Sequence, residues 1–169
     1  MNSVQKYDLK KCIEGIKVIC SNIEELNLWH INPKMSMYEC LQNELIRFLA
    51  FLTSSHGYIT DDTLVVLEII TGKECTADKF WKIIEELGPF SENYINEIPV
   101  IITNTVYADK NMKSIIGKKG KNAFVMRDAF GIIGNSVMGD MDNYTFLLYK
   151  NFLLNIKNYI EYLLGEKEK

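Results

Sequence analysis

The sequence predicts an all-α protein, a single-domain bundle of about seven helices. Apolar residues recur at every third or fourth position in five segments, which is the repeat of an amphipathic helix. A short polar turn separates two such segments twice, so two helical hairpins are expected at about residues 36–72 and 122–164. Only two short runs, within 61–71 and 100–107, have the β-branched residues that would suit a strand instead.

Length and composition fit one globular domain that spans residues 1–169. The chain has 47% hydrophobic and 24% charged residues, enough apolar side chains for one sizeable core. Its formal charge is −3, too small and of the wrong sign for a surface that binds nucleic acid or an anionic membrane as a whole. There is neither a signal-peptide pattern nor a run of about 18 apolar residues. We therefore expect a cytoplasmic protein without membrane contact, and the abundance of Lys, Ile and Asn suggests a bacterial source.

Apolar stripes predict the first two helices. The second helix begins after Ser36, an N-cap residue with Glu39 three positions later as a capping box. Apolar residues lie nearly all around it, which predicts a central position in the bundle. The first helix carries Leu9, Ile13, Ile16, Cys20, Ile23 and Leu26, and the second carries Leu41, Leu45, Ile46, Phe48, Leu49, Ala50, Phe51 and Leu52.

The middle of the chain is predicted to be helical in shorter pieces. Thr60 caps a helix over 61–71, and Gly72 suits its C-terminal end. A second capped segment, from Thr76 to Gly88, follows it directly. Pro99 then kinks or splits the next segment, because proline cannot donate a helical hydrogen bond.

Residues 109–122 are predicted to form the one true loop, because lysines and glycines replace the apolar stripe there. Its lysines are Lys110, Lys113, Lys118, Lys119 and Lys121. Two helices beyond this loop complete the second hairpin. The last of them has the cleanest stripe in the chain, formed by Tyr149, Phe152, Leu153, Ile156, Tyr159, Ile160 and Leu163.

The turns of the two hairpins carry a family resemblance. A helix that ends in small residues is followed by Gly57-Tyr58-Ile59-Thr60 and by acids that open the next helix. Over Phe48–Asp62 this pattern resembles the TerB-like (tellurite-resistance) domain, and Gly139–Asn143 resembles it in weaker form. The resemblance covers most of residues 38–164. It implies an all-helical stress-response fold whose acidic residues gather at one end and bind a metal ion in some members.

Under that resemblance, the candidate metal ligands are Asp61, Asp62, Asp140 and Asp142. The aspartate that the family has before Gly57 is replaced by His56, and Thr145 stands near the place of an acid in the last helix. An EF-hand loop that starts at Asp140 would need glycine at position 145 and glutamate where the chain has Asn151. Acids at helix N-termini are also explained by capping and by the helix dipole. Both interpretations stay open, and we expect at most weak binding of divalent ions.

The sharpest short motif lies in the lysine-rich loop. The run Gly117-Lys118-Lys119-Gly120 resembles the GXXG loop of KH domains, whose glycines let the backbone lie against nucleic-acid phosphates. The candidate interaction residues are Lys113, Gly117, Lys118, Lys119, Gly120 and Lys121. A lysine-rich loop without a specific ligand is the alternative, and only residues 100–107 could supply the upstream strand of a KH fold. Either way, the glycines predict a loop that is poorly ordered when free.

Catalytic motifs are missing from the sequence. It has two histidines, His30 and His56, and no Gly-x-Ser-x-Gly, HExxH, Walker or dinucleotide pattern. The cysteines are Cys12, Cys20, Cys40 and Cys75, and their spacing fits reduced thiols better than a zinc site. We therefore expect a non-enzymatic binding or regulatory module that has no cofactor and whose partner is another protein. A metal-binding stress protein and a small RNA-binding protein are the alternative hypotheses, and the sequence leaves the oligomeric state open.

Overall fold

Helices make up all the regular structure of the described residues. The computed structural model describes residues 1–30, 34–53, 59–88, 90 and 92–165. In chain order they form α1 (Ser3–Glu25), α2 (Met37–Thr53), α3 (Asp61–Thr71), α4 (Ala77–Leu87), α5 (Glu92–Asn96), α6 (Val100–Ile116), α7 (Asn122–Ser136), a 3-10 turn η2 (Met138–Asp140) and α8 (Asn143–Leu164). The prediction of an all-α bundle is confirmed. The strand alternatives for 61–71 and 100–107 are wrong, because α3 and α6 occupy those positions.

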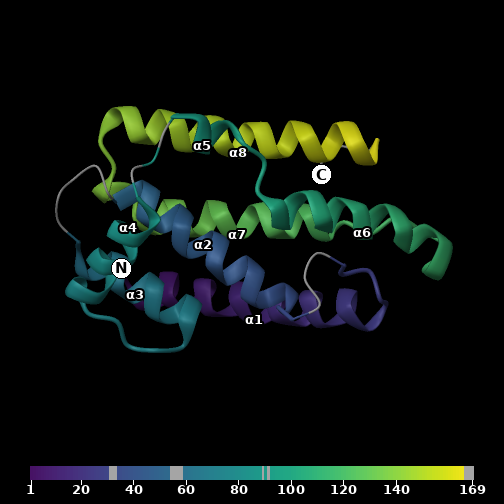
Figure 1. Cartoon of the computed structure of the whole chain (residues 1–169), viewed down its shortest axis with the longest axis horizontal. Coiled ribbons are helices and arrows are strands. Elements are labelled where there is room, and N and C mark those ends of the chain that lie inside the picture. The colour runs from purple at the N-terminus through teal and green to yellow at the C-terminus, as the bar shows by residue number, and fades with distance from the viewer. Residues whose placement is uncertain (31–33, 54–58, 89, 91, 166–169) are drawn as a thin grey trace.

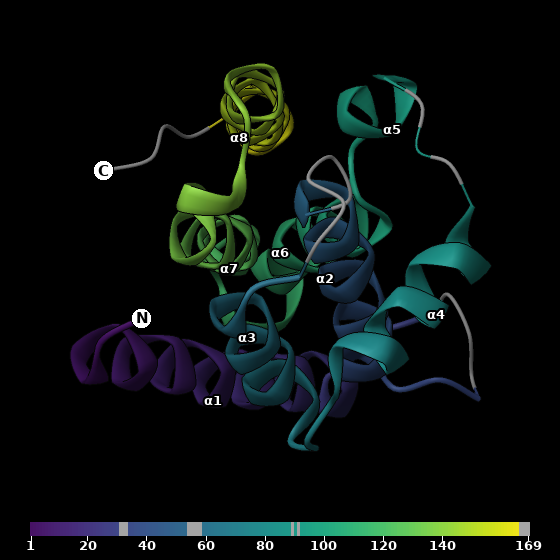
Figure 2. The ribbon, with the colours of Figure 1, turned by 90° about the vertical axis from the view of Figure 1, so that its left-hand side faces the viewer.

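The helix α2 lies at the centre of the bundle, as predicted from its apolar residues. It packs against α1, α3, α6 and α7, and more lightly against α4. Figure 1 and Figure 2 show α1 and α8 at opposite edges, with α7 between them. The predicted hairpins are both present, since α2 packs on α3 and α7 packs on α8.

Three predicted caps set the start of their helices. The hydroxyl of Ser36 accepts a hydrogen bond from the backbone N–H of Glu39 at 3.1 Å, which fixes the first turn of α2. The hydroxyl of Thr60 caps α3 and that of Thr76 caps α4 in the same way, so each accepts an N–H from three residues on.

Aromatic side chains form the centre of the core. The ring of Phe48 lies 5.2 Å from that of Phe130 and 4.9 Å from that of Phe152, measured between centroids. The ring of Tyr149 lies 6.0 Å from Phe48 on the same side. These contacts join α2 to α7 and α8. The predicted core residues of the first hairpin, Phe48, Leu49 and Leu52, lie in the interior with 0% exposure.

Two helices approach closely where α8 crosses α7. The ring of Tyr149 lies directly over the backbone of Gly134, so that a Cβ atom at Gly134 would overlap it. The hydroxyl of Tyr149 donates to the backbone oxygen of Gly131 at 2.8 Å and contacts the side-chain oxygen of Asn135 at 2.9 Å. Glycine at position 134 is therefore a packing requirement of this crossing.

In the described part of the chain, no helix has the length and the apolar character needed to cross a bilayer.

Candidate functional site

The acidic turns of the two hairpins meet at one end of the bundle. The carboxylate of Asp140, in η2, accepts a short hydrogen bond from the hydroxyl of Thr60 and a second one from the hydroxyl of Thr63 at 3.1 Å. Residues 80 positions apart thus join the start of α3 to the turn before α8. The carboxylate of Asp140 is therefore hydrogen-bonded to threonine hydroxyls of the first hairpin.

The other candidate metal ligands have different neighbours. Asp142 accepts the backbone N–H of Thr145 at 2.7 Å and so caps α8. Asp62 lies 2.6 Å from the amino group of Met1, and Asp61 is exposed in the first turn of α3. Among the described residues, no group of three or more His, Cys, Asp and Glu side chains could hold a metal ion. The four aspartates therefore do not form one ligand set there, and His56 lies outside the described residues.

The lysine-rich loop is much shorter than predicted. The prediction of a loop over 109–122 is wrong, because α6 continues to Ile116 and α7 begins at Asn122. Lys110 and Lys113 are therefore helical residues. Lysine and asparagine are compatible with a helix, and the sequence prediction gave too much weight to their lack of an apolar stripe. The loop between the two helices is 117–121.

The buried carboxylate of Asp109 holds the end of the 117–121 loop through hydrogen bonds. The side chain of Asp109, on α6, is completely buried and accepts the N–H of Asn122 at 3.1 Å and that of Ala123 at 2.8 Å. The backbone oxygen of Asp109 accepts the N–H of Gly120 at 3.0 Å. Burial raises the pKa of Asp109 to about 6, and the hydrogen bonds from Ala123 and Asn122 oppose that rise. Asp109 therefore caps α7 from another helix.

Both glycines of the loop have structural functions in this arrangement. Gly117 ends α6 with a left-handed backbone, at φ 82°. A Cβ atom at Gly120 would collide with the carboxylate of Asp109 and lie 2.5 Å from the sulfur of Met112. Lys119 donates to the backbone oxygen of Leu164 at 2.8 Å, at the C-terminal end of α8. The contacts of Lys119 and both glycines are therefore internal, while Lys118 is exposed.

A second acid that caps a distant helix, the half-buried Glu44, was not predicted from the sequence. Its two carboxylate oxygens accept the backbone N–H groups of Val100 and Ile101, each at 2.8 Å, and so cap α6 from α2. Burial raises the pKa of Glu44, and these hydrogen bonds oppose the rise. Proline at position 99 has no side-chain cap of its own. A cap that lies 56 residues away in sequence has no local signal.

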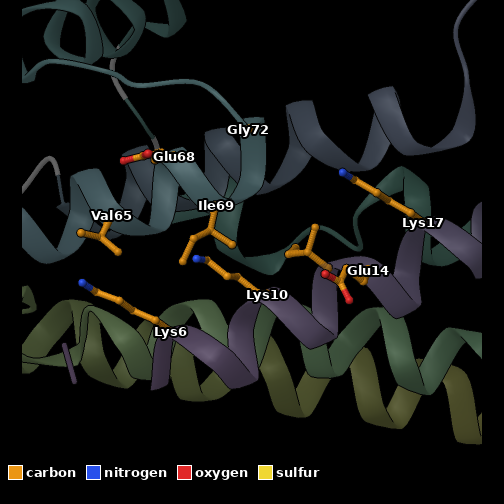
Figure 3. Close-up of a pocket in the computed structure, with 9 residues that line it drawn as sticks. Lys6, Lys10, Glu14, Lys17, Val65, Glu68, Ile69 and Gly72 are labelled. Carbon is orange, nitrogen blue, oxygen red and sulfur yellow. The ribbon is translucent and has the colours of Figure 1, made fainter. Parts of the chain in front are cut away.

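A hollow with both apolar and charged walls lies between α1 and α3. It has a volume of about 420 Å³. Lys6, Lys10, Ile13, Glu14 and Lys17 line it from α1, and Val65, Glu68, Ile69 and Gly72 line it from α3. We call it the α1–α3 groove. Figure 3 shows that the side chains of Lys6 and Lys10 extend from α1 toward α3. Its volume falls within the range of ligand sites, and its walls carry five charged side chains beside the partly buried Val65 and Ile69.

The charged side chains of the α1–α3 groove differ in whether they contact other charged or aromatic groups of the protein. Glu14 lies 3.6 Å from the ammonium of Lys11, outside the groove. The ammonium of Lys17 lies 5.0 Å from the centre of the Tyr38 ring. Within the described residues, neither Lys6 nor Lys10 forms an ion pair. The two lysines therefore give the wall on α1 a local positive charge.

The sequence analysis did not select the residues of this groove. Lysines on the polar face of an amphipathic helix are usually only solvated, so Lys6 and Lys10 carry no signal by themselves. The position of α3 beside α1 gives them a neighbour, and only the structure supplies that position.

Comparisons with protein-family models, with curated proteins and with solved structures found no match for this chain.

Proposed function

We propose that the protein is a non-enzymatic binding module that receives part of another protein in the α1–α3 groove. The observation that carries this proposal is the groove itself. It combines about 420 Å³ of space with the apolar side chains of Ile13, Val65 and Ile69 and with lysines that have no acidic partner in the described residues. Partner recognition by a groove between helices requires an apolar floor for affinity and charges at the wall for specificity.

The state of the thiols supports a role without nucleophilic catalysis. Burial raises the pKa of Cys12 to about 11, with a further contribution from Asp128. Burial likewise raises the pKa of Cys20 to about 12 and that of Cys40 to about 11. Thiols with such pKa values are protonated near neutral pH, and the thiolate is the reactive form. These three cysteines therefore suit packing better than chemistry.

The two alternative functions have weaker support. The acids proposed as metal ligands are engaged as caps or by hydroxyl and amino groups, as described for Asp140, Asp142 and Asp62. The glycines and Lys119 of the proposed RNA-binding loop make contacts within the protein. Among the described residues, the side chains of Lys6 and Lys10 in the α1–α3 groove form no such internal contacts. The sequence pattern and composition add the cytoplasm of a bacterium, and the resemblance to TerB-like domains adds a stress response, as the proposed setting of this module.

A photo-crosslinking experiment tests the proposal. Glu68, exposed at the groove, is replaced by benzoylphenylalanine, and Lys82, exposed on α4, is replaced in a matched control. In the cells that produce the protein, we expect a discrete protein adduct from position 68 that position 82 does not give. The partner identified by mass spectrometry should then bind the purified protein and lose affinity for Ile69→Glu. Equal adducts at both positions, or none at position 68, would contradict the proposed function.

A further inference from the structure

We infer that the α1–α3 groove takes an acidic amphipathic helix of the partner protein. This inference rests on the proposed function, because it names the chemistry of the segment that the groove would receive. Two rows of side chains with the same spacing carry it. They are Lys6 and Lys10 on α1 and Val65 and Ile69 on α3.

Each row consists of residues four positions apart. In an α-helix, this separation places the two side chains on one face, about 6 Å apart along the axis at 1.5 Å per residue. In Figure 3, the side chains of Lys6 and Lys10 extend toward the part of α3 that carries Val65 and Ile69. Both pairs line the same groove. The groove therefore offers two positive charges and two apolar contacts at the repeat of one helical turn.

An amphipathic helix can match both rows at once. Two carboxylates four positions apart on a partner helix have the spacing of Lys6 and Lys10. Apolar residues on the neighbouring strip of that helix would cover Val65 and Ile69, which are only partly buried. Helices that lay an apolar face into a groove are a common mode of peptide recognition. An extended peptide has a different repeat, with side chains alternating between two faces.

Charge favours a short acidic segment over a long polyanion. The protein as a whole has a formal charge of −3, so a nucleic acid or an anionic bilayer would meet net repulsion away from this groove. A local acidic segment would contact the two lysines without approaching the rest of the surface. The exposed apolar surface of Val65 and Ile69 also has no use in binding phosphates.

The carboxylate of Glu68 provides a second test of the inference, through its charge. It lines the groove from α3 and forms no ion pair within the described residues. Figure 3 shows its carboxylate turned away from Lys6 and Lys10. An acidic partner would experience repulsion from this exposed carboxylate. Neutralising Glu68 should therefore strengthen binding, whereas a variant that merely damages the fold would weaken it.

Designed peptides test the inference directly. The probe is a fluorescent helical peptide of roughly 15 residues, or four turns, with glutamates four positions apart beside a strip of leucines. A second peptide has lysines in place of these glutamates. We expect the acidic peptide to bind with a Kd on the order of 10 to 100 µM, a weak helix-in-groove affinity. Binding should weaken as salt rises from about 0.05 M to 0.5 M, because salt screens exposed charges.

Variants of the protein assign this binding to the groove. Lys6→Glu/Lys10→Glu should weaken the acidic peptide by about tenfold or more and should instead bind the lysine peptide, because opposed like charges suppress association. Glu68→Gln should strengthen the acidic peptide by about twofold to fivefold, the range of a single exposed charge. Lys79→Glu/Lys82→Glu, on exposed positions of α4, is the matched control and should leave the affinity unchanged.

The outcomes separate this inference from the proposed function. No binding of the acidic peptide below about 1 mM, a ΔG° of only about −4 kcal/mol, would overturn the inference. Equal loss in both double-lysine variants would also overturn it. So would tighter, groove-dependent binding of single-stranded RNA or of phosphatidylserine vesicles. If crosslinking at position 68 captures a partner through a neutral or basic segment, the proposed function stands and the acidic helix is wrong.

Discussion

Replacement of Gly134 by alanine tests the close contact between α7 and α8, where Tyr149 of α8 lies over α7. A Cβ atom at Gly134 would lie 2.7 Å from the hydroxyl oxygen of Tyr149 and still closer to two carbons of its ring. Carbon atoms normally approach to about 3.5 Å. The ring would therefore have to move by roughly 1 Å, and its hydrogen bonds to Gly131 and Asn135 would break or stretch.

The magnitude follows from three opposing contributions. Overpacking costs about 1–3 kcal/mol, and the disturbed hydrogen bonds of Tyr149 cost about 1 kcal/mol more. Alanine regains about 1 kcal/mol over glycine inside a helix. We therefore expect Gly134→Ala to lower the free energy of unfolding by about 1–3 kcal/mol. Urea titration followed by circular dichroism measures this, with an unchanged m-value as the sign of a two-state comparison.

Gly131→Ala is the matched control, on the same helix and one turn earlier. Its added Cβ would meet only a methyl carbon of Leu153 at 3.7 Å, which is an ordinary contact. This variant should be as stable as the wild type, or more stable by up to about 1 kcal/mol. The double variant Gly134→Ala/Tyr149→Leu should cost less than the sum of its single changes, because the two sites share one contact. A Gly134→Ala protein at least as stable as the wild type would refute the close crossing of α7 and α8.

Three further predictions concern the core and the loop between α6 and α7. Leu49→Ala should cost about 2–5 kcal/mol, because Leu49 is fully buried on the central helix; an unchanged melting temperature would show that α2 is peripheral. In urea, Gly120→Ala should be more destabilising than Gly117→Ala, because of these two glycines only Gly120 lacks room for a Cβ. Gly117→Ala should cost about 1–2 kcal/mol, for the left-handed backbone alone. The reverse order would contradict the contact of Gly120 with Asp109. The raised pKa of Asp109, about 6 against 3.8, means that the folded state binds a proton more tightly. The contribution of this shift to the free energy of unfolding is therefore full below about pH 4 and is lost as pH rises through about 6. In that window the free energy of unfolding of the wild type should fall by up to about 1.4 kcal/mol per pH unit relative to that of Asp109→Asn. Parallel curves of unfolding free energy against pH for the two proteins would disprove the shift.

Local signals predicted much of the fold, because they act within a few residues. The stripe that begins at Leu9 and Ile13 faces the core in α1, and the hydroxyls of Ser36 and Thr60 cap α2 and α3 as expected. The end of α6 escaped prediction for the opposite reason. Of the apolar residues after Asp109, Met112 is buried but Ile115 and Ile116 are exposed, so the last turns of this helix had only a weak apolar stripe.

The candidate site was less predictable than the fold, because it depends on contacts between distant segments. Asp140 was selected as a possible metal ligand, but its carboxylate lies against the hydroxyls of Thr60 and Thr63, about half the chain away. Lys6 and Lys10 were not selected, since only the position of α3 distinguishes them from other lysines on α1. A single sequence carries no record of such pairings.

The caps that α6 and α7 receive from other helices have a consequence for the order of folding. The N–H groups at the start of α6 find their acceptor on α2, and those of α7 find theirs on Asp109 of α6. An isolated peptide from either helix would leave these donors to water and would be only marginally helical. We therefore expect α6 to become stable only after α2 has docked, and α7 only after α6. For α6 and α7, helix initiation is a long-range event, so a fragment of the chain that lacks α2 should lose the helical structure of α6 and α7 as well.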